Sequence, residues 1–397
     1  MRGWPFSEKP LLVFWETTKA CMLACKHCRA EAILHALPGE LTTEEGMKLI
    51  DDIASFGKPT PILVFTGGDP LMRKDFWDLL EYALDQGVRA SVAPSVTPLL
   101  TSEAISRMAR TGVRMVSLSL DSPYPHVHDA VRGVPGTWQR TLWAVREFHK
   151  NGVRVQINTV VMRDTVEGLA DMVPLLKRLG VKVWEVFYHI PVGRAGREGD
   201  LTAAEYEDVG NFLYEASKYG IMIRTVEGPS FRRIALVRRL IEEEGYEPPT
   251  EYPRPGRLYE RLSSRLRELL GEPEGPPLAH TTGTMDGRGI VFISHNGNVY
   301  PSGFLPLSAG NIRHRSLVSI YRKSLLFRTI RDKIKGRCGA CEFRDICGGS
   351  RARAYAYTGD PYAEDPACPY KPGTMPVALV RRAVRQHASR PASHPPH

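Results

Sequence analysis

Hydrophobic runs alternate with helical patterns through the first half of the chain, and this alternation predicts the fold. Six short apolar segments have the character of strands, and we expect them at residues 10–18, 62–66, 89–94, 115–120, 154–161 and 183–190. Between and after them, apolar residues recur at helical spacing near 43–56, 75–86, 101–111, 137–150, 165–179 and 202–218. Parallel strands need a crossover between them, so these six strand–helix units predict a parallel sheet. Since a closed barrel has eight units, we expect an α/β fold with a partial (β/α)6 barrel over residues 10–222.

The remainder of the chain follows a different pattern. Two charged helices over 231–244 and 258–270 predict a solvated helical insertion at 223–280, and a lid over the barrel mouth is the alternative. A small C-terminal domain is expected over 281–371. It begins with a hairpin, because two apolar runs flank Asn296-Gly297, and a helix over 316–333 follows. Residues 372–397 are basic and rich in Pro, Ser and Ala, which predicts a largely disordered tail.

Composition narrows the class of protein. The chain has 397 residues, of which 42% are apolar and 24% charged, as in ordinary globular proteins. Its net charge is +9, but five basic residues and no acidic residue follow Tyr370, so a nucleic-acid partner is not expected. No run approaches the ~20 apolar residues of a membrane span, and the first ten residues lack a secretion signal. We therefore expect a cytoplasmic protein with no membrane partner.

Seven cysteines carry the most specific chemistry, and an odd count favours metal or catalytic roles over disulfides. Cys21, Cys25 and Cys28 have C-x3-C-x2-C spacing directly after the first predicted strand. Three such thiolates can hold three corners of an iron–sulfur cube and leave one iron open to a small molecule. The alternatives are three unligated thiols, or a zinc site for which His27 is the only local fourth ligand.

This first group resembles the signature of the radical S-adenosylmethionine (SAM) enzymes, which follows the first strand of a partial (β/α)6 barrel. The resemblance implies that Cys21, Cys25 and Cys28 hold a [4Fe-4S] cluster whose fourth iron binds the amino and carboxylate groups of SAM. It also implies that an electron cleaves SAM to a 5′-deoxyadenosyl radical, which abstracts hydrogen from substrate. The electron donor would be of the flavodoxin or ferredoxin type. His27 stands where the family usually has an aromatic residue beside the adenine.

The end of the second predicted strand supports this resemblance. Thr66, Gly67, Gly68 and Asp69 lie at the edge where parallel sheets bind ligands. They are similar to the family's GGEP motif, whose backbone binds the SAM amino group. Asp69 replaces the usual glutamate and has a shorter reach. Without the resemblance, the same residues would be read as an ordinary turn.

Three further positions are candidates for SAM binding. In the resemblance, Ser119 and Asn158 lie on strands four and five and face the SAM ribose. Arg132 belongs to an HD-x2-RG segment, and its guanidinium suits the SAM carboxylate. Surface or capping roles are the alternatives. We interpret the neighbouring His126 and His128 as structural residues, because an i, i+2 pair at a helix start is a poor metal site.

The second group of cysteines has the spacing C-x2-C-x5-C-x20-C, formed by Cys338, Cys341, Cys347 and Cys368. Four thiolates can saturate a [4Fe-4S] cluster and leave no open iron. Zinc is an equal alternative on spacing alone, because many zinc ribbons begin with C-x2-C.

The segment around these cysteines resembles the SPASM domain, or its shortened twitch form, which binds auxiliary iron–sulfur clusters. The full pattern has seven cysteines and two clusters, and the four cysteines here match its second cluster. Ser302 stands where many relatives have the cysteine of a Pro-Cys pair, and Arg351 stands where the full pattern has another cysteine. We therefore predict one auxiliary [4Fe-4S] cluster.

The resemblance also suggests a substrate. The C-terminal segment is most similar to haem-biosynthesis members, of the coprohaem decarboxylase and haem d1 types, which implies modification of a tetrapyrrole. Arg344, Arg351 and Arg353 could then meet propionate groups, although ordinary surface roles are the alternative. Peptide maturation is the second hypothesis. A third, of another class, is a non-catalytic iron–sulfur or zinc protein, and the open corner of the first cysteine group argues against it.

Overall fold

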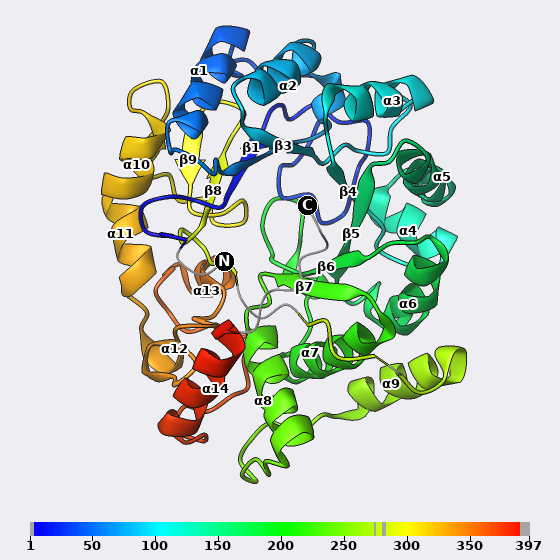
Figure 1. Ribbon diagram of the computed structural model, residues 1–397, viewed down its shortest axis with the longest axis vertical. Coiled ribbons are helices and arrows are strands. Elements are labelled where there is room, and N and C mark those ends of the chain that lie inside the picture. The colour runs from blue at the N-terminus through cyan, green and yellow to red at the C-terminus, as the bar shows by residue number, and fades with distance from the viewer. Residues whose placement is uncertain (1–3, 274, 280–282, 390–397) are drawn as a thin grey trace.

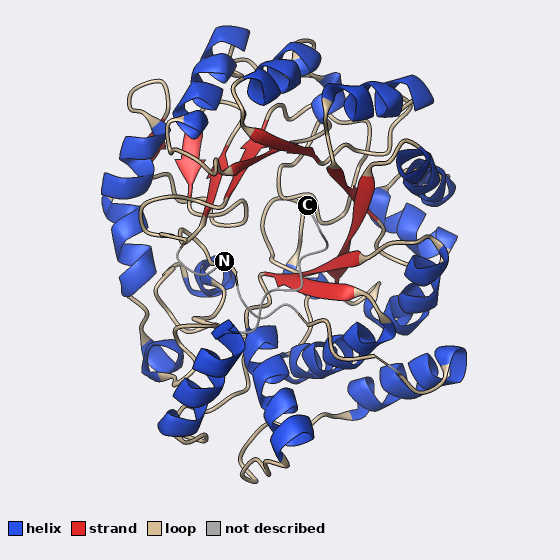
Figure 2. Ribbon diagram, in the orientation of Figure 1, coloured by secondary structure: helices blue, strands red, loops and turns tan. Residues whose placement is uncertain are grey.

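The computed structural model describes residues 4–273, 275–279 and 283–389, and a curved parallel sheet lies at its centre (Figures 1 and 2). Strands β1 to β7 are parallel neighbours in chain order. They comprise Leu12–Glu16, Ile62–Thr66, Arg89–Val92, Met115–Ser119, Arg154–Val161, Val183–Tyr188 and Met222–Val226. The predicted parallel sheet of a partial barrel is confirmed. The last strand, β7, was missed, so the sheet continues past residue 222, where the predicted barrel ended.

Helices cover the convex side of the sheet (Figure 1). They are α1 Thr43–Ala54, α2 Phe76–Asp85, α3 Ser102–Thr111, α4 Pro125–Arg132, α5 Thr137–Lys150, α6 Leu169–Arg178 and α7 Ala203–Ala216. The sequence did not predict α4, which begins with Pro125 at its first turn and ends at Gly133 in a left-handed conformation.

Alternate residues of each strand face opposite sides of the sheet. On β1, Val13 and Trp15 are buried against the helices, whereas Leu12 and Phe14 face an internal cavity. The same alternation on β5 buries Ile157 under the helices and turns Asn158 inward. Each of the strands β1 to β7 therefore supplies side chains to the cavity.

The two helices of the expected insertion pack on the barrel rather than over its mouth. Helix α8, Ser230–Glu244, and helix α9, Arg257–Leu270, both contact α7, and α9 also contacts α6. Figure 1 shows α9 on the outside of the molecule, so the lid alternative is wrong. Buried apolar residues on α8 show that this helix is not simply solvated.

The predicted C-terminal hairpin is present, and it extends the barrel sheet. Strand β8, Ile290–Ile293, pairs in parallel with β1, and β9, Asn298–Tyr300, pairs antiparallel with β8. Gly297 makes the turn with φ of +84°. A two-residue strand, β10, Gly310–Asn311, completes this edge.

The helices after the hairpin differ from the prediction in two places. The single helix expected over 316–333 is divided into α10, Leu317–Lys323, and α11, Leu325–Asp332. Ser324 separates them with extended backbone, and its side chain caps α11. The short helices α12, Gly336–Ala340, and α13, Arg351–Thr358, follow. The predicted disordered tail is wrong over Val377–Ser389, which forms helix α14 on α8. Residues 390–397 of that predicted tail lie outside the described residues.

Candidate active site

A cavity of about 1050 Å³ lies inside the curved sheet. Its walls come from the inward-facing residues of the strands, the first cysteine loop and the C-terminal region. Most of the residues predicted to bind a cofactor line it: Cys21, Cys25, His27, Cys28, Thr66, Gly67, Gly68, Ser119, Arg132 and Asn158. The structure thus brings together residues that are up to 137 positions apart in the chain.

The three cysteines sit on a loop that backbone hydrogen bonds hold in place. Cys21 N–H donates to the carbonyl of Ile33 at 2.7 Å. The thiols in turn accept hydrogen bonds, with Leu23 N–H 3.4 Å from Cys21 Sγ and Ala32 N–H 3.4 Å from Cys28 Sγ. Burial raises the pKa values of Cys21 and Cys25. Buried thiols with one open side suit a metal cluster better than a role as surface nucleophiles.

Arg132 and Asp121 form a buried ion pair beside these thiols. Arg132 Nη2 lies 2.7 Å from Asp121 Oδ2, and its Nη1 lies 3.6 Å from Cys25 Sγ. His27 Nε2 is 3.4 Å from the same carboxylate oxygen. Burial alone would raise the pKa of Asp121, but Arg132 and His27 outweigh it and hold that pKa well below its usual range. The sequence places Asp121 in a polar cluster at the end of the fourth predicted strand, but its ion pair with Arg132 was not predicted, because only the fold brings the two together.

His128 has a structural position, as the sequence suggested. Its Nδ1 accepts a hydrogen bond of 3.1 Å from the backbone N–H of Asp121. Burial lowers the pKa of His128 to about 4, so its ring is neutral near pH 7. A neutral ring fixes the turn that carries Asp121.

The Thr66–Asp69 turn packs tightly against the start of the cysteine loop. A Cβ atom on Gly68 would lie 2.3 Å from the carbonyl oxygen of Ala20, and one on Gly67 would lie 2.5 Å from that of Thr18. Only glycine fits at these positions. Asp69 does not line the cavity: its carboxylate accepts hydrogen bonds from Thr97 at 2.7 Å and from the N–H groups of Leu71 and Ser95. Its side chain holds the turn from behind.

Polar side chains also cover the cavity wall near β5. Gln156 donates one hydrogen bond of 2.8 Å to Asn158 Oδ1 and another of 2.7 Å to Glu185. Burial raises the pKa of Glu185, and Arg224 opposes that shift. Asn158 therefore presents an oriented amide to this side of the cavity, and Ser119 lines the same cavity.

The second group of cysteines surrounds a separate small hollow. Cys338, Cys341, Cys347 and Cys368 line it together with Arg233, Asp365 and Tyr370. Burial raises the pKa of each of these four thiols, that of Cys341 to about 12. Among the described residues, no three Cys, His, Asp or Glu side chains are placed to hold a single metal ion. Gly349 lines both this hollow and the large cavity, so one loop separates the two.

The two positions that depart from the full SPASM cysteine pattern have oxygen partners. Ser302 Oγ is 3.4 Å from Glu227 and also hydrogen-bonds Asp286. The backbone N–H of Arg351 donates to Asp286 at 3.0 Å, and Ser350 Oγ donates to Glu227. Burial and the neighbouring Asp286 raise the pKa of Glu227. These two acids share a hydrogen bond in the cavity wall.

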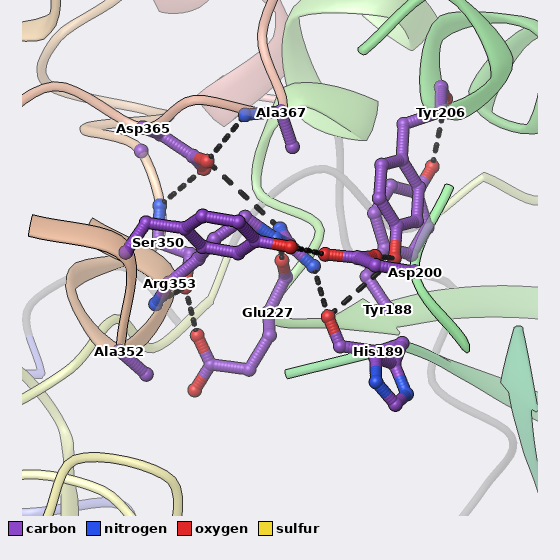
Figure 3. Close-up of polar contacts among 12 residues, drawn as sticks. Tyr188, His189, Asp200, Tyr206, Glu227, Ser350, Ala352, Arg353, Asp365 and Ala367 are labelled. Atoms are coloured by element: carbon purple, nitrogen blue, oxygen red, sulfur yellow. Dashed lines mark hydrogen bonds and ion pairs between the residues drawn. The ribbon is translucent and has the colours of Figure 1, made fainter. Parts of the chain in front are cut away.

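The three arginines proposed to meet propionates do not line the large cavity. Arg353 donates to the backbone carbonyls of His189 and Glu227 at 2.6 and 3.0 Å (Figure 3). Arg351 binds carbonyls of its own domain, and Arg344 donates to the carbonyl of Asp332. That hypothesis is wrong for these residues.

Other arginines do line the cavity, and sequence spacing did not single them out. Arg194 donates to the carbonyl of Ala32, and Arg232 donates to those of Ile346 and Thr284. Within the described residues neither forms an ion pair within 4 Å, so their charges remain available to an anionic ligand. Arg29 also lines the cavity but pairs with Glu16 at 2.9 Å.

Comparison with known proteins defines the class. Residues 15–176 match the model of the radical SAM superfamily, and residues 285–342 match SPASM, an iron–sulfur cluster-binding domain. The fold is that of two solved structures at 16% identity. One is anSMEcpe with bound AdoMet, with a TM-score of 0.62 over 95% of this chain and 96% of that one. The other is Streptococcus suis SuiB bound to precursor peptide SuiA, with a TM-score of 0.65 over 91% and 76%. The molecule is a radical SAM enzyme with an iron–sulfur domain.

Similarity to curated proteins identifies the family of this chain within the radical SAM enzymes. The AdoMet-dependent heme synthase of Nitratidesulfovibrio vulgaris is 40% identical over 92% of this chain and 93% of its own length. The AdoMet-dependent heme synthase of Methanosarcina barkeri is 36% identical over 92% and 98%. The PqqA peptide cyclase of Bradyrhizobium diazoefficiens is 28% identical over 95% and 90%. The chain therefore belongs to the radical SAM family that contains the AdoMet-dependent heme synthases. Within the described residues, no helix is both long and apolar enough to cross a membrane.

Proposed function

We propose that this enzyme makes haem from an iron coproporphyrin by removing carboxyl groups from propionate side chains. The observation that carries the proposal is the identity of 36–40% to three AdoMet-dependent heme synthases over 92% of the chain. Relatives named for peptide modification match at 28%. The cavity is consistent with an anionic ligand, because Arg194 and Arg232 line it and, among the described residues, have no carboxylate within 4 Å.

In this proposal Cys21, Cys25 and Cys28 hold a [4Fe-4S] cluster with one iron open to SAM. SAM bound there supplies, on reduction, the radical that abstracts hydrogen from substrate. Arg132 and the turn at Gly67 and Gly68 hold the amino-acid end of SAM. His27, Ser119, Asn158 and Thr66 contact the rest of the molecule. Asp69 supports the turn from behind, which departs from the role that the resemblance implied.

Cys338, Cys341, Cys347 and Cys368 hold one auxiliary [4Fe-4S] cluster. All four cysteines line the same small hollow, and each is partly buried. Ser302 and Arg351 bind oxygen groups of the protein, which supports a single cluster in this region. A flavodoxin- or ferredoxin-type protein would supply electrons.

The conversion of a propionate to a vinyl group releases one electron, which needs an acceptor. A propionate that loses a hydrogen atom, CO2 and one electron becomes a vinyl group. The chain's own residues orient the side chain that reacts and keep water out. An auxiliary cluster, when bound, can take up the remaining electron. Its site lies behind the Gly349 loop, directly beside the cavity.

The test is an anaerobic reaction of the reconstituted enzyme with dithionite, SAM and iron coproporphyrin III. We expect haem and 5′-deoxyadenosine to form together. Cys21→Ala should abolish both products, because one corner of the cluster is lost. Absence of haem would overturn the proposal. So would a rise in 5′-deoxyadenosine with a peptide but not with the tetrapyrrole.

A further inference from the structure

The auxiliary cysteines lie in a cage of N–H donors. Asp365 N–H is 3.3 Å from Cys338 Sγ. Each of the other three thiols also accepts a backbone hydrogen bond, and the donors are Phe343 to Cys341, Gly349 to Cys347 and Tyr370 to Cys368. Hydrogen bonds to the sulfurs of an iron–sulfur cluster are one of the main controls on its reduction potential.

Arg233 adds a buried donor to this cage. Its side chain is 1% exposed and lines the cysteine hollow. Its Nη1 and Nη2 atoms donate to the carboxylate of Glu207 at 2.9 and 2.5 Å. Nη1 also donates to the hydroxyl of Tyr252 at 2.8 Å. Its Nε atom is buried, and no group of the described residues accepts a hydrogen bond from it. Such a group in a native protein calls for a partner that the protein atoms do not supply.

Arg351 supplies a second buried N–H donor, close to Cys338. It is 3% exposed, and Nη1 and Nε donate to carbonyls of Pro361, Ala363 and Gly349. Its Nη2 is also buried, and it has no hydrogen-bond partner in the part of the chain that the structure describes. A Cβ atom on Gly349 would lie 2.6 Å from Nη2 and 2.8 Å from Cys338 Sγ, so the nitrogen and the thiol both lie against this glycine. The positive charge of Arg351 also lowers the pKa of Cys338, against the larger effect of burial.

The two arginines differ in how far their charge is compensated. Arg233 is paired with Glu207, whereas Arg351 forms no ion pair within 4 Å in the described part of the chain. The carboxylate of Asp365 opposes these charges by raising the pKa of Cys338, and it lies 3.9 Å from Arg353. Arg351 therefore contributes the less compensated positive charge.

We propose that Arg233 Nε and Arg351 Nη2 donate hydrogen bonds to sulfurs of the auxiliary cluster and raise its reduction potential, so that it accepts the electron released from substrate. The inference rests on the proposed function for the source of that electron. Reduction adds negative charge to the cluster, and N–H donors and a guanidinium charge stabilise the reduced state more than the oxidised one. Both arginines are positioning residues, because they act through the cluster.

The test is a redox titration of the fully loaded enzyme, followed by electron paramagnetic resonance (EPR). Arg351→Met removes the charge and the donor at similar length. We expect it to disfavour reduction of the auxiliary cluster at least tenfold, which is about 59 mV for one electron. Arg351→Lys keeps the charge and should give a smaller change of the same sign. Arg233→Lys keeps the pair with Glu207 but lacks Nε–H, and should lower the potential as well.

The matched control is Arg344→Met. Arg344 lines the same hollow but gives its N–H to the carbonyl of Asp332, so its loss should change the reduction equilibrium less than about threefold. If Arg351→Met fails to retain the cluster, the reduction potentials of Arg351→Lys and Arg233→Lys test the inference instead. Unchanged potentials in these variants would overturn the inference even if the enzyme makes haem. Lowered potentials in an enzyme that makes no haem would support the tuning and overturn the proposed substrate.

Discussion

Asp69 shows how the position of one carboxylate decides its role. The resemblance to a GGEP motif suggested a contact with SAM, but the shorter side chain turns away from the cavity and accepts three hydrogen bonds within the protein. The glycines before it approach backbone so closely that a Cβ would clash. The motif therefore has a packing role as well as the proposed binding role.

Asp69→Ala should destabilise the protein by about 1–3 kcal/mol, because it leaves buried donors without an acceptor. Denaturant unfolding of the variant and the wild type measures this difference. Asp69→Asn should lose less stability, since its amide oxygen can still accept hydrogen bonds. An unchanged stability with a large loss of SAM affinity would show that Asp69 binds SAM directly.

Two buried histidines predict a dependence of stability on pH. Burial lowers the pKa values of His128 and His189 to about 4 in the folded protein, against 6.5 for the ordinary side chain. Their contribution to stability is therefore present above pH 6.5. It is lost as pH falls toward 4, because the unfolded chain then binds protons that the folded chain excludes.

His128→Asn should make stability less sensitive to acid, because the amide can accept from Asp121 N–H without titrating. Between pH 7 and pH 5 we expect the wild type to lose about 1–2 kcal/mol more than the variant. Thermal melting at both pH values measures this. His35→Asn at an exposed position is the control and should behave like the wild type. A variant as acid-sensitive as the wild type would refute the assignment.

Individual site residues could be predicted from the sequence where their spacing is specific for one kind of site. The cysteines and Arg132 stood out in the sequence, and all three cysteines of the first group line the cavity with Arg132. Glu227, Arg194 and Arg232 did not stand out, and the ion pair between Asp121 and Arg132 was not predicted. Their partners come from distant segments, and no local pattern reveals which way a polar side chain will turn.

At the scale of elements, the sequence predicted helices and strands with strong hydrophobic periodicity and missed short ones. The strands β2 and β5 have the predicted bounds, because apolar runs and flanking glycines mark them. The short helix α4 and the strand β7 were missed, since polar residues dilute their patterns. For α14 a signal was present: Val380 and Ala383 are three positions apart on one face. The basic composition hid it.

Helix α14 should stabilise the C-terminal region through this apolar face. Val380 is 1% exposed and belongs to the same apolar cluster as Leu240, Phe343 and Cys347. Val380→Asp would bury an unpaired charge, and we expect a loss of at least about 2 kcal/mol together with a lower iron content. Val377→Asp on the same helix is the control, because Val377 is 48% exposed. Equal melting temperatures for the two variants would contradict this packing.

At the scale of the whole molecule, the barrel and the C-terminal region share one wall. Strand β8 joins the barrel sheet beside β1, and the Gly349 loop separates the large cavity from the auxiliary cysteines. The sequence predicted both units but not this junction, which depends on contacts between residues more than 250 positions apart. In the proposed reaction the electron passes from the substrate to the auxiliary cluster, and the thickness of this wall sets the distance between them.

The central claim is that seven cysteines form one open and one closed cluster. EPR of the reduced, reconstituted enzyme with and without SAM tests it most directly. We predict about eight irons per chain and two cluster signals. SAM should change only the signal that Cys21→Ala removes and leave unaltered the one that Cys368→Ala removes. A single signal with about four irons, or a SAM effect on both signals or on neither, would contradict the account.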